Sequence, residues 1–256
     1  MYEVNILRII KCSLILTLIL IMMSSLVYAE ETSEAKSYFI EGSMAEMKGD
    51  YKTAVTKLSK AIELDQNIAS AYYFRAEAFF NLKKYTYAFK DYDKAIKLEP
   101  DNPLYYKSRA ISFAVLEKYE LALKDSNKVI ELKPDDPSNY FIRGKLFSSL
   151  NQYDRSIEDF DKAIELNPDK ADYYSERSNS YIQLGQYEKA LVNINKAIEL
   201  DQNVVRFYVR RGITYSLLKD YSKSIDDFNK ALELEPNNAL AYRLLIDSKK
   251  KLEDQQ

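Results

Sequence analysis

The amino-acid sequence predicts an all-α fold in which pairs of helices stack into an open-ended solenoid. The first observation is a 34-residue pattern that repeats six times between Ala35 and Asn238 without insertion or deletion. The second is that tyrosines and small residues recur at helical spacing, so that each copy holds two amphipathic helices. A fixed period of this length is typical of stacked repeats, in which each unit buries its apolar face only against its neighbours.

Positions in the pattern are numbered from the first residue of each copy, which is Ala35, Ala69, Pro103, Pro137, Ala171 or Val205. The predicted units therefore cover residues 35–68, 69–102, 103–136, 137–170, 171–204 and 205–238. Residues 239–252 continue as a first helix without a second one and become increasingly polar, so we expect a capping helix there. We expect no domain boundary between residues 35 and 252.

Tyrosines and small residues define the two helices of each unit. Tyrosine occupies the fourth and the seventeenth position throughout, beginning with Tyr38 and Tyr51. The eighth and twentieth positions carry only Gly, Ala or Ser, beginning with Gly42 and Ala54, and small side chains let two helix axes approach to about 8–10 Å. Pro100 and its equivalents end the second helix, and connections this short make neighbouring helices antiparallel.

The recurring Tyr, Gly or Ala, Ala and Pro positions resemble the tetratricopeptide repeat, and the resemblance covers the whole chain after residue 34. Tyr38 and its equivalents stand where that family often has Trp, and Gln66 and Gln202 stand where it usually has Pro. The resemblance implies a right-handed superhelix whose concave face is formed mainly by the first helix of each pair. It also implies that this concave face is the place to look for a bound protein segment.

Residues 1–29 have the pattern of a secretory signal peptide. Two basic residues, Arg8 and Lys11, precede an uncharged and largely aliphatic stretch that ends with Ala29. Cleavage after Ala29 predicts an exported protein, either periplasmic or secreted. The alternative is an uncleaved anchor that associates with a membrane through residues 12–29, because these 18 uncharged residues reach the lower limit for a span.

The composition argues against several classes of function. The chain carries 37 basic and 39 acidic residues, so it lacks the basic excess of a nucleic-acid-binding protein. It has no His, and its single Cys, Cys12, lies in the expected leader, so the commonest general base, thiol nucleophile and metal ligands are missing. No Gly-rich phosphate loop is present. We therefore expect no enzyme activity, no cofactor, no metal and no small-molecule substrate.

Charged residues recur at two further positions of each unit. The seventh is Arg in units two to six and the twenty-third is Asp or Asn, whereas unit one reverses both signs. Contact between successive units would place Lys57 against Arg75, so the charges predict ion pairs within each unit, with a structural role. The predicted pairs are Glu41 with Lys57, Arg75 with Asp91, Arg109 with Asp125, Arg143 with Asp159, Arg177 with Asn193, and Arg211 with Asp227.

In the family that this chain resembles, the second, fifth, ninth, twelfth and thirteenth positions face the concave groove. Here they carry many apolar groups, which favours a contact surface for a peptide or a helix. Some of them, especially Ile111 and Ile213, have the alternative role of filling gaps between adjacent units. The candidate groove residues are Phe39, Tyr73, Glu77, Phe80, Lys107, Ile111, Val115, Phe141, Lys145, Asn179, Ile182, Val209 and Ile213, with Asp172 and Leu217 among them.

Three arginines near the C-terminal end, Arg206, Arg210 and Arg243, are expected to project from neighbouring first helices toward the same side. Clustered arginines suit a carboxylate or phosphate ligand, and the alternative is a solvated face. The carboxylate clamp of chaperone-binding family members is not predicted. Phe141 replaces its expected lysine, and Glu176 would repel the ligand.

The sequence thus favours an exported scaffold that binds a partner peptide or helix in the concave groove. One alternative is a structural protein of the cell envelope that self-associates through the groove or through an incompletely capped end. Another is an adaptor that stays anchored to the membrane by its N-terminal helix. All three place function in contacts with other macromolecules and none of them in catalysis.

Overall fold

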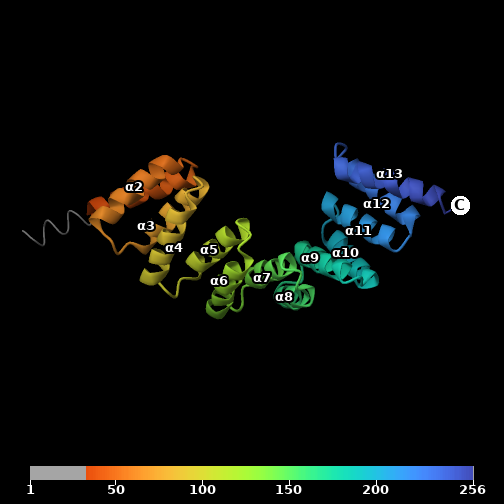
Figure 1. Ribbon diagram of the computed structural model, residues 1–256, viewed down its shortest axis with the longest axis horizontal. Helices are drawn as coiled ribbons and strands as arrows, with labels where there is room; N and C mark the ends of the chain where they lie inside the picture. Colours follow the sequence, from red (N-terminus) through yellow and green to blue (C-terminus); the bar gives the residue numbers. More distant parts are fainter. Residues whose placement is uncertain (1–32, 256) are drawn as a thin grey trace, which may run out of the picture. The chain divides into compact units, whose positions relative to one another are not determined.

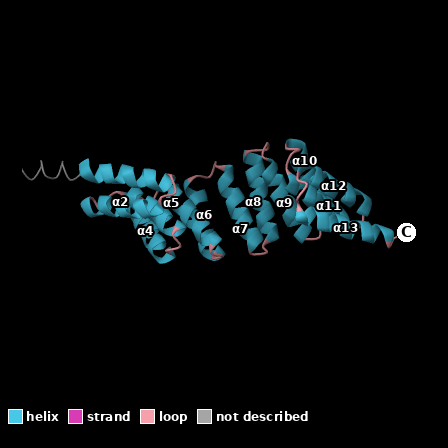
Figure 2. Ribbon diagram, turned by 90° about the horizontal axis from the view of Figure 1, so that it is seen from above, coloured by secondary structure: helices cyan, strands magenta, loops and turns pink. Residues whose placement is uncertain are grey.

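The computed structural model describes residues 33–255, which form helices joined by short connections (Figures 1 and 2). The expected leader over residues 1–29 lies outside the described residues. None of the helices within residues 33–255 is long and apolar enough to cross a membrane. A first helix covers residues 33–47. It is followed by α2 (Tyr51–Leu64), α3 (Ala69–Asn81), α4 (Tyr85–Leu98), α5 (Pro103–Val115), α6 (Tyr119–Leu132), α7 (Pro137–Ser149), α8 (Tyr153–Leu166), α9 (Ala171–Gln183), α10 (Tyr187–Leu200), α11 (Val205–Leu217), α12 (Tyr221–Leu234) and α13 (Ala239–Glu253).

Helices that are adjacent in the sequence pack against each other. Within a repeat, α3 packs against α4, α7 against α8, α9 against α10, and α11 against α12. Between repeats, α2 packs against α3, α8 against α9, and α10 against α11, while α12 packs against the last helix, α13. The described residues therefore form the all-α solenoid of paired helices that the repeat predicts.

The chain divides into two compact parts, each larger than a single repeat, which are called unit 1 and unit 2 from here on. Unit 1 ends at Arg109 and unit 2 begins at Ala110, within α5. The uniform repeat pattern predicts no such division, because every copy looks alike in the sequence. Unit 1 has its core around Leu58, Tyr72 and Tyr92, and unit 2 has a large core cluster that contains Ile194 and Phe228. A repeat contacts only its neighbours, so each part of the array is held together by local packing.

The two helices of a repeat approach closely at the eighth position. A Cβ atom built on Gly144 would lie 2.7 Å from the ring of Phe160, and one built on Gly212 would lie 2.7 Å from the ring of Phe228. Both rings are fully buried. A larger side chain at this position would push the helices apart, so the small residue sets the spacing at which the aromatic ring fills the interface.

The turn between the two helices has the same backbone conformation in every repeat. The fifteenth position is left-handed in all six, with φ of +80° at Gly49 and +70° at Gly185. The same position holds Lys83, Glu117, Asn151 and Lys219, with φ between 57° and 63°. Only Gly adopts this conformation without a steric cost. Four of the six turns therefore carry local strain that the surrounding helices outweigh.

Replacing Lys219 with Gly is expected to raise the free energy of unfolding by up to about 1 kcal/mol, because it removes the Cβ atom from a left-handed residue. Gly185→Ala, in the equivalent turn of the preceding repeat, is the matched control and is expected to lower it by a similar amount. Urea denaturation followed by circular dichroism measures both changes. A loss of stability in the Lys219→Gly variant would contradict the steric explanation of this turn.

The first helix, over residues 33–47, exposes an apolar face formed by Ile40, Met44 and Met47. Its tenth position, Met44, is 50% exposed, whereas the tenth position is buried in α3, α7, α9, α11 and α13. In those helices this position meets the second helix of the preceding repeat. The hydroxyl of Ser180 on α9, for example, lies 2.9 Å from that of Ser156 on α8. The face of the first helix is therefore of the kind that receives another helix elsewhere in the chain.

Candidate functional site

The seventh-position side chain bonds the twenty-third-position side chain of its own repeat wherever both lie in the same compact unit. Arg143 donates from Nε and Nη2 to the two carboxylate oxygens of Asp159, over 2.8 and 2.7 Å, and Lys57 lies 2.6 Å from Glu41. The predicted partners Arg109 and Asp125 share a repeat but fall in compact units 1 and 2, respectively, so their pairing stays a prediction. The remaining three predicted pairs also meet, with Nε-to-oxygen distances of 2.7 Å from Arg75 to Asp91, 2.7 Å from Arg177 to Asn193 and 2.9 Å from Arg211 to Asp227.

Each of these arginines also contacts the preceding repeat, and the charge pattern of the sequence does not predict this second contact. The partner is the residue at the twenty-fifth position, sixteen residues earlier in the chain. Arg143 donates from Nη1 to Asn127 over 2.8 Å, and the signal in the sequence is that the twenty-fifth position is polar in every repeat concerned. The other contacts join Arg75 to Ser59, Arg109 to Asp93, Arg177 to Asp161, and Arg211 to Asn195.

The two partners of an arginine balance its charge. Arg143 has a carboxylate at Asp159 and an amide at Asn127, whereas Arg177 has the amide at Asn193 and the carboxylate at Asp161. The hydrogen bonds to Asp159 raise the pKa of the Arg143 guanidinium above its ordinary value. A guanidinium with its charge neutralised and its donors occupied joins helices and is not available to a ligand.

Arg143→Ala removes this link and leaves the buried carboxylate of Asp159 without its counter-charge. We expect the free energy of unfolding to fall by about 3 kcal/mol, the lower end for a buried pair, because the arginine is only half-buried. Lys162→Ala, which removes an exposed partner of Glu165, is the control and is expected to change it far less. Thermal denaturation measures both. Equal losses would refute a structural role for Arg143.

The charge balance at Arg177 predicts coupling between its two partners. Asp161→Asn leaves Arg177 without a carboxylate, and Asn193→Asp gives it two, so each single variant is expected to be less stable than the wild type. The double variant exchanges the acid between the two repeats and is expected to recover stability, with a coupling free energy of about 1 kcal/mol. A double-mutant cycle measured by chemical denaturation tests this. Additive losses would mean that the two positions act independently.

The face formed by the second, fifth, ninth, twelfth and thirteenth positions of the first helices is called the first-helix face below. In unit 1 its aromatic members are half-buried, and each packs against an aromatic residue at another position of the pattern. The ring centroids of Tyr73 and Tyr105 lie 5.2 Å apart, those of Phe39 and Phe74 lie 6.0 Å apart, and Phe80 packs against Tyr85 at 5.1 Å. Much of the predicted surface in this unit therefore also holds neighbouring helices together.

Carboxylates lie beside these rings in unit 1. The hydroxyl of Tyr92 donates to Glu77 Oε1 over 2.5 Å. Burial, and next the charge of Glu77, raise the pKa of the Glu46 carboxyl above its ordinary value. Glu46 occupies the twelfth position of its helix, but it was missed among the candidate residues. Lys107, the remaining candidate in this unit, is half-buried on α5.

In unit 2 the first-helix face contains an apolar hollow between α5 and α7. Ile111 and Val115 are 46% and 63% exposed, and both line the hollow together with Lys145. The hollow has a volume of about 350 Å³. Ile111 therefore does not simply fill a gap between repeats. The full lining is Ala110, Ile111, Ala114, Val115, Tyr119, Ile142, Lys145, Leu146 and Ser149.

Most of the other candidates in unit 2 contribute less exposed surface, with Leu217 as the exception. Phe141 packs against Tyr173 with a centroid distance of 4.9 Å, and Ile213 packs against the core cluster. Val209, expected on the exposed face, is only 8% exposed and belongs to the same core cluster as Leu245 of α13, so its surface is used in packing. Leu217 is exposed, whereas Asn179 and Ile182 are half-buried on α9.

The arginines near the C-terminal end are occupied by acids of the preceding repeat. Arg206 pairs with Asp172, and Arg210 lies 3.3 Å from Glu176 while donating to the backbone carbonyl of Ser175 over 2.5 Å. An acidic ligand would have to displace these partners. Arg243 is exposed on α13. The two paired arginines therefore do not form the free anion-binding patch that was one of the two alternatives.

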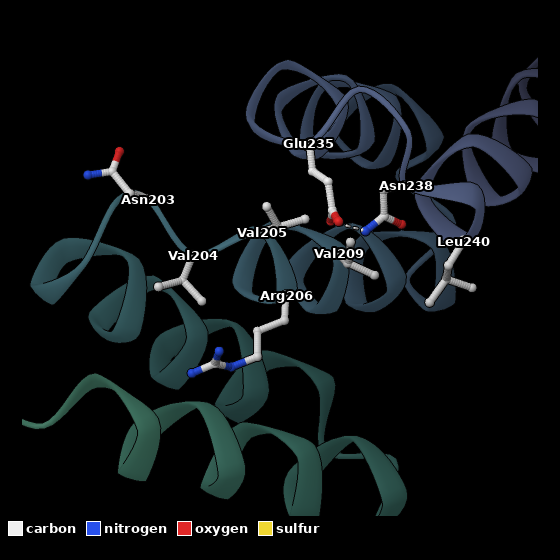
Figure 3. Close-up of a pocket in the computed structure, with 8 residues that line it drawn as sticks. All are labelled: Asn203, Val204, Val205, Arg206, Val209, Glu235, Asn238 and Leu240. Carbon is white, nitrogen blue, oxygen red and sulfur yellow. Dashed lines mark hydrogen bonds between the residues drawn. The ribbon is translucent and has the colours of Figure 1, made fainter.

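A second hollow, of about 480 Å³, lies next to Arg206 between α11 and the start of α13 (Figure 3). The Arg206 guanidinium points away from Glu235 and Asn238, whose side chains are joined by a 2.6 Å hydrogen bond. The side chains of Arg206, Glu235 and Asn238 at this hollow are thus already paired. Within residues 33–255 no group of three or more acidic, His or Cys side chains could hold a metal ion.

Comparison with known protein families identifies the repeat. A model of the tetratricopeptide repeat matches residues 69–102, 139–170 and 205–238. A second model of the repeat matches residues 47–83 and 178–219, and a third matches residues 160–192. Together they cover more than half of the chain, and none of them describes a catalytic family. No protein with a curated description matches the sequence.

Solved structures share the fold at low identity. YrrB, described as a tetratricopeptide repeat protein with an unusual peptide-binding site, is 22% identical over 73% of this chain and 96% of its own, with a TM-score of 0.59. PilF of Pseudomonas aeruginosa is 16% identical over 85% of this chain and 99% of its own, with a TM-score of 0.68. MamA of Desulfovibrio magneticus RS-1 is 20% identical over 67% of this chain and 97% of its own, with a TM-score of 0.62.

Proposed function

The chain belongs to the tetratricopeptide repeat family, and from this premise we propose that it is a non-enzymatic scaffold that binds a segment of another protein on its first-helix face. The observation that carries the proposal is the hollow between α5 and α7, where Ile111 and Val115 remain exposed after the helices have packed. Clustered exposed apolar groups are typical of contact sites. A surface between two neighbouring helices can receive an extended peptide or one face of a helix.

The chemistry of the described residues supports binding over catalysis. Residues 33–255 contain neither His nor Cys. The seventh-position arginines would otherwise suggest a site for an anionic substrate, but an acid balances their charge, as Asp159 of the same repeat does for Arg143 and Asp161 of the preceding repeat does for Arg177. YrrB, which shares the fold, is described as having a peptide-binding site, and this favours a peptide as the ligand class.

The scaffold is further proposed to act after export. The order of basic, apolar and small residues over 1–29 supports a signal peptide, and the absence of Cys from residues 30–256 suits an oxidising compartment. N-terminal sequencing of the protein recovered from the cell envelope or medium tests this. A chain that starts at Glu30 supports export, whereas an intact N-terminus in the membrane fraction favours the anchored adaptor.

Affinity capture with the immobilised chain tests the binding surface. The double variant Ile111→Ser/Val115→Ser is expected to lose at least tenfold in recovery of the partner, because it makes the exposed wall of the hollow polar. The matched control, Leu121→Ser/Val192→Ser, changes two equally exposed apolar residues on the second helices α6 and α10 and is expected to retain the partner.

Equal recovery by wild type and by the Ile111→Ser/Val115→Ser variant would place recognition outside this face. Circular dichroism melting curves establish that both variants remain folded. Phe141 and Arg210 are less suitable for this test, because both take part in packing or ion pairing and their loss would perturb the fold itself.

Self-association is a second candidate, favoured by the apolar face of the first helix at Ile40, Met44 and Met47. A second copy of the chain is the occupant that this alternative requires. Size-exclusion chromatography with light scattering separates the two candidates. A mass that is independent of concentration and equal to one chain removes self-association, whereas a dimer that Met44→Lys/Met47→Lys converts to a monomer supports it.

A further inference from the structure

The hollow between α5 and α7 carries a single charge. Its lining contains one ionisable cation, Lys145, and no carboxylate. Lys145 belongs to α7, one turn after Phe141 and one turn before Ser149, so the three side chains follow one stripe of that helix. The Lys145 ammonium lies 5.7 Å from the centroid of the Phe141 ring, which holds it at the edge of the apolar surface.

Lys145 differs in this respect from the arginines of α9 and α11. Arg177, Arg206, Arg210 and Arg211 each have an acid within ion-pair distance, and exposed lysines such as Lys162 pair with a glutamate three residues later. Within the described chain no carboxylate lies within ion-pair distance of the Lys145 ammonium. The Lys145 ammonium is therefore free to donate hydrogen bonds to solvent or to a ligand at the edge of the hollow.

The size of the hollow limits what it can accept. Its volume of about 350 Å³ lies at the lower end of the range for ligand pockets, about 300–1,000 Å³. It is open and lined mainly by Ala, Ile, Val and Leu side chains. One or two large apolar side chains of a partner fit such a space, with the rest of the partner lying across the first-helix face.

We propose that the hollow recognises a peptide segment in which a large aliphatic or aromatic residue is flanked by Asp or Glu. The apolar side chain enters the space beside Ile111 and Val115, and the carboxylate pairs with Lys145. Charge complementarity selects the acidic flank, because a basic residue there would meet an unpaired ammonium. This inference rests on the proposed function and specifies the chemistry of the partner at that surface.

Selection from a displayed library of random twelve-residue peptides tests the inference on the full chain. Wild-type protein is expected to enrich peptides with Leu, Ile or Phe next to Asp or Glu. Lys145→Glu is expected to lose this acidic preference and to favour Lys or Arg at the same place. Lys162→Glu, which reverses an exposed lysine on the second helix α8, is the matched control and keeps the wild-type preference.

Fluorescence anisotropy of one selected peptide then gives the size of the effect. Lys145→Glu is expected to weaken binding at least tenfold, and raising the salt concentration is expected to weaken the wild-type complex, since the pair is exposed. Replacing the apolar anchor of the peptide with Ala is expected to abolish binding. Unchanged circular dichroism spectra of both lysine variants exclude unfolding as the cause.

The inference is overturned if no peptides are enriched, if the enriched peptides lack an acidic flank, or if the wild type and the Lys145→Glu variant show the same preference. Enrichment of basic peptides, or of segments of the chain itself, would identify a different occupant and also overturns it. The proposed function is judged separately by partner capture with the Ile111→Ser/Val115→Ser variant. A partner lost by that variant but insensitive to Lys145→Glu would keep the binding surface and reject the acidic segment.

Discussion

Close packing within each helix pair is the constraint on which the rest of the structure depends. At the eighth position of the pattern the helices approach so closely that a Cβ atom on Gly144 would lie 2.7 Å from the buried ring of Phe160. Only when a pair closes in this way does it offer the next pair a surface of the right shape. Since a repeat has no partners other than its neighbours, one insertion would disturb the packing on both of its sides. This explains a 34-residue period that is kept without interruption.

The same constraint requires that polar groups between the helices find partners locally. The seventh-position arginines meet it through contacts in two repeats, as Arg143 does by bonding Asp159 in its own repeat and Asn127 in the preceding one. Hydroxyls meet it between α7, α8 and α9, where those of Ser148, Ser156 and Ser180 lie 2.7 to 3.2 Å from one another. Unsatisfied polar groups would be costly in so narrow an interface. Because the polar groups find their hydrogen-bond partners in the same or the adjacent repeat, repeats with different polar residues can stack in one array.

A partner can bind where side chains remain exposed or unpaired after the helices have packed. The hollow between α5 and α7 keeps apolar side chains exposed beside Lys145, an ammonium without a carboxylate partner in the described chain. The first helix leaves Met44 exposed at a position that the preceding helix covers in other repeats. Elsewhere the candidate residues are more deeply engaged, as Phe141 is with Tyr173. Residues of the first-helix face thus differ in function, because neighbouring side chains cover some of them and leave others exposed.

The sequence by itself determined the helix pairs, the small eighth position and the partners of the arginines within a repeat. These depend on periodicity along one chain and on the reversed charges of Glu41 and Lys57 in the first repeat, which make only the contact within a repeat complementary. The tertiary structure alone decided that Val209 is buried, that Asp172 and Glu176 neutralise Arg206 and Arg210, and that Ile111, Val115 and Lys145 enclose a common space. Those contacts depend on how side chains of different lengths pack between successive repeats. The repeating pattern gives the position of each residue in its helix but does not give this packing.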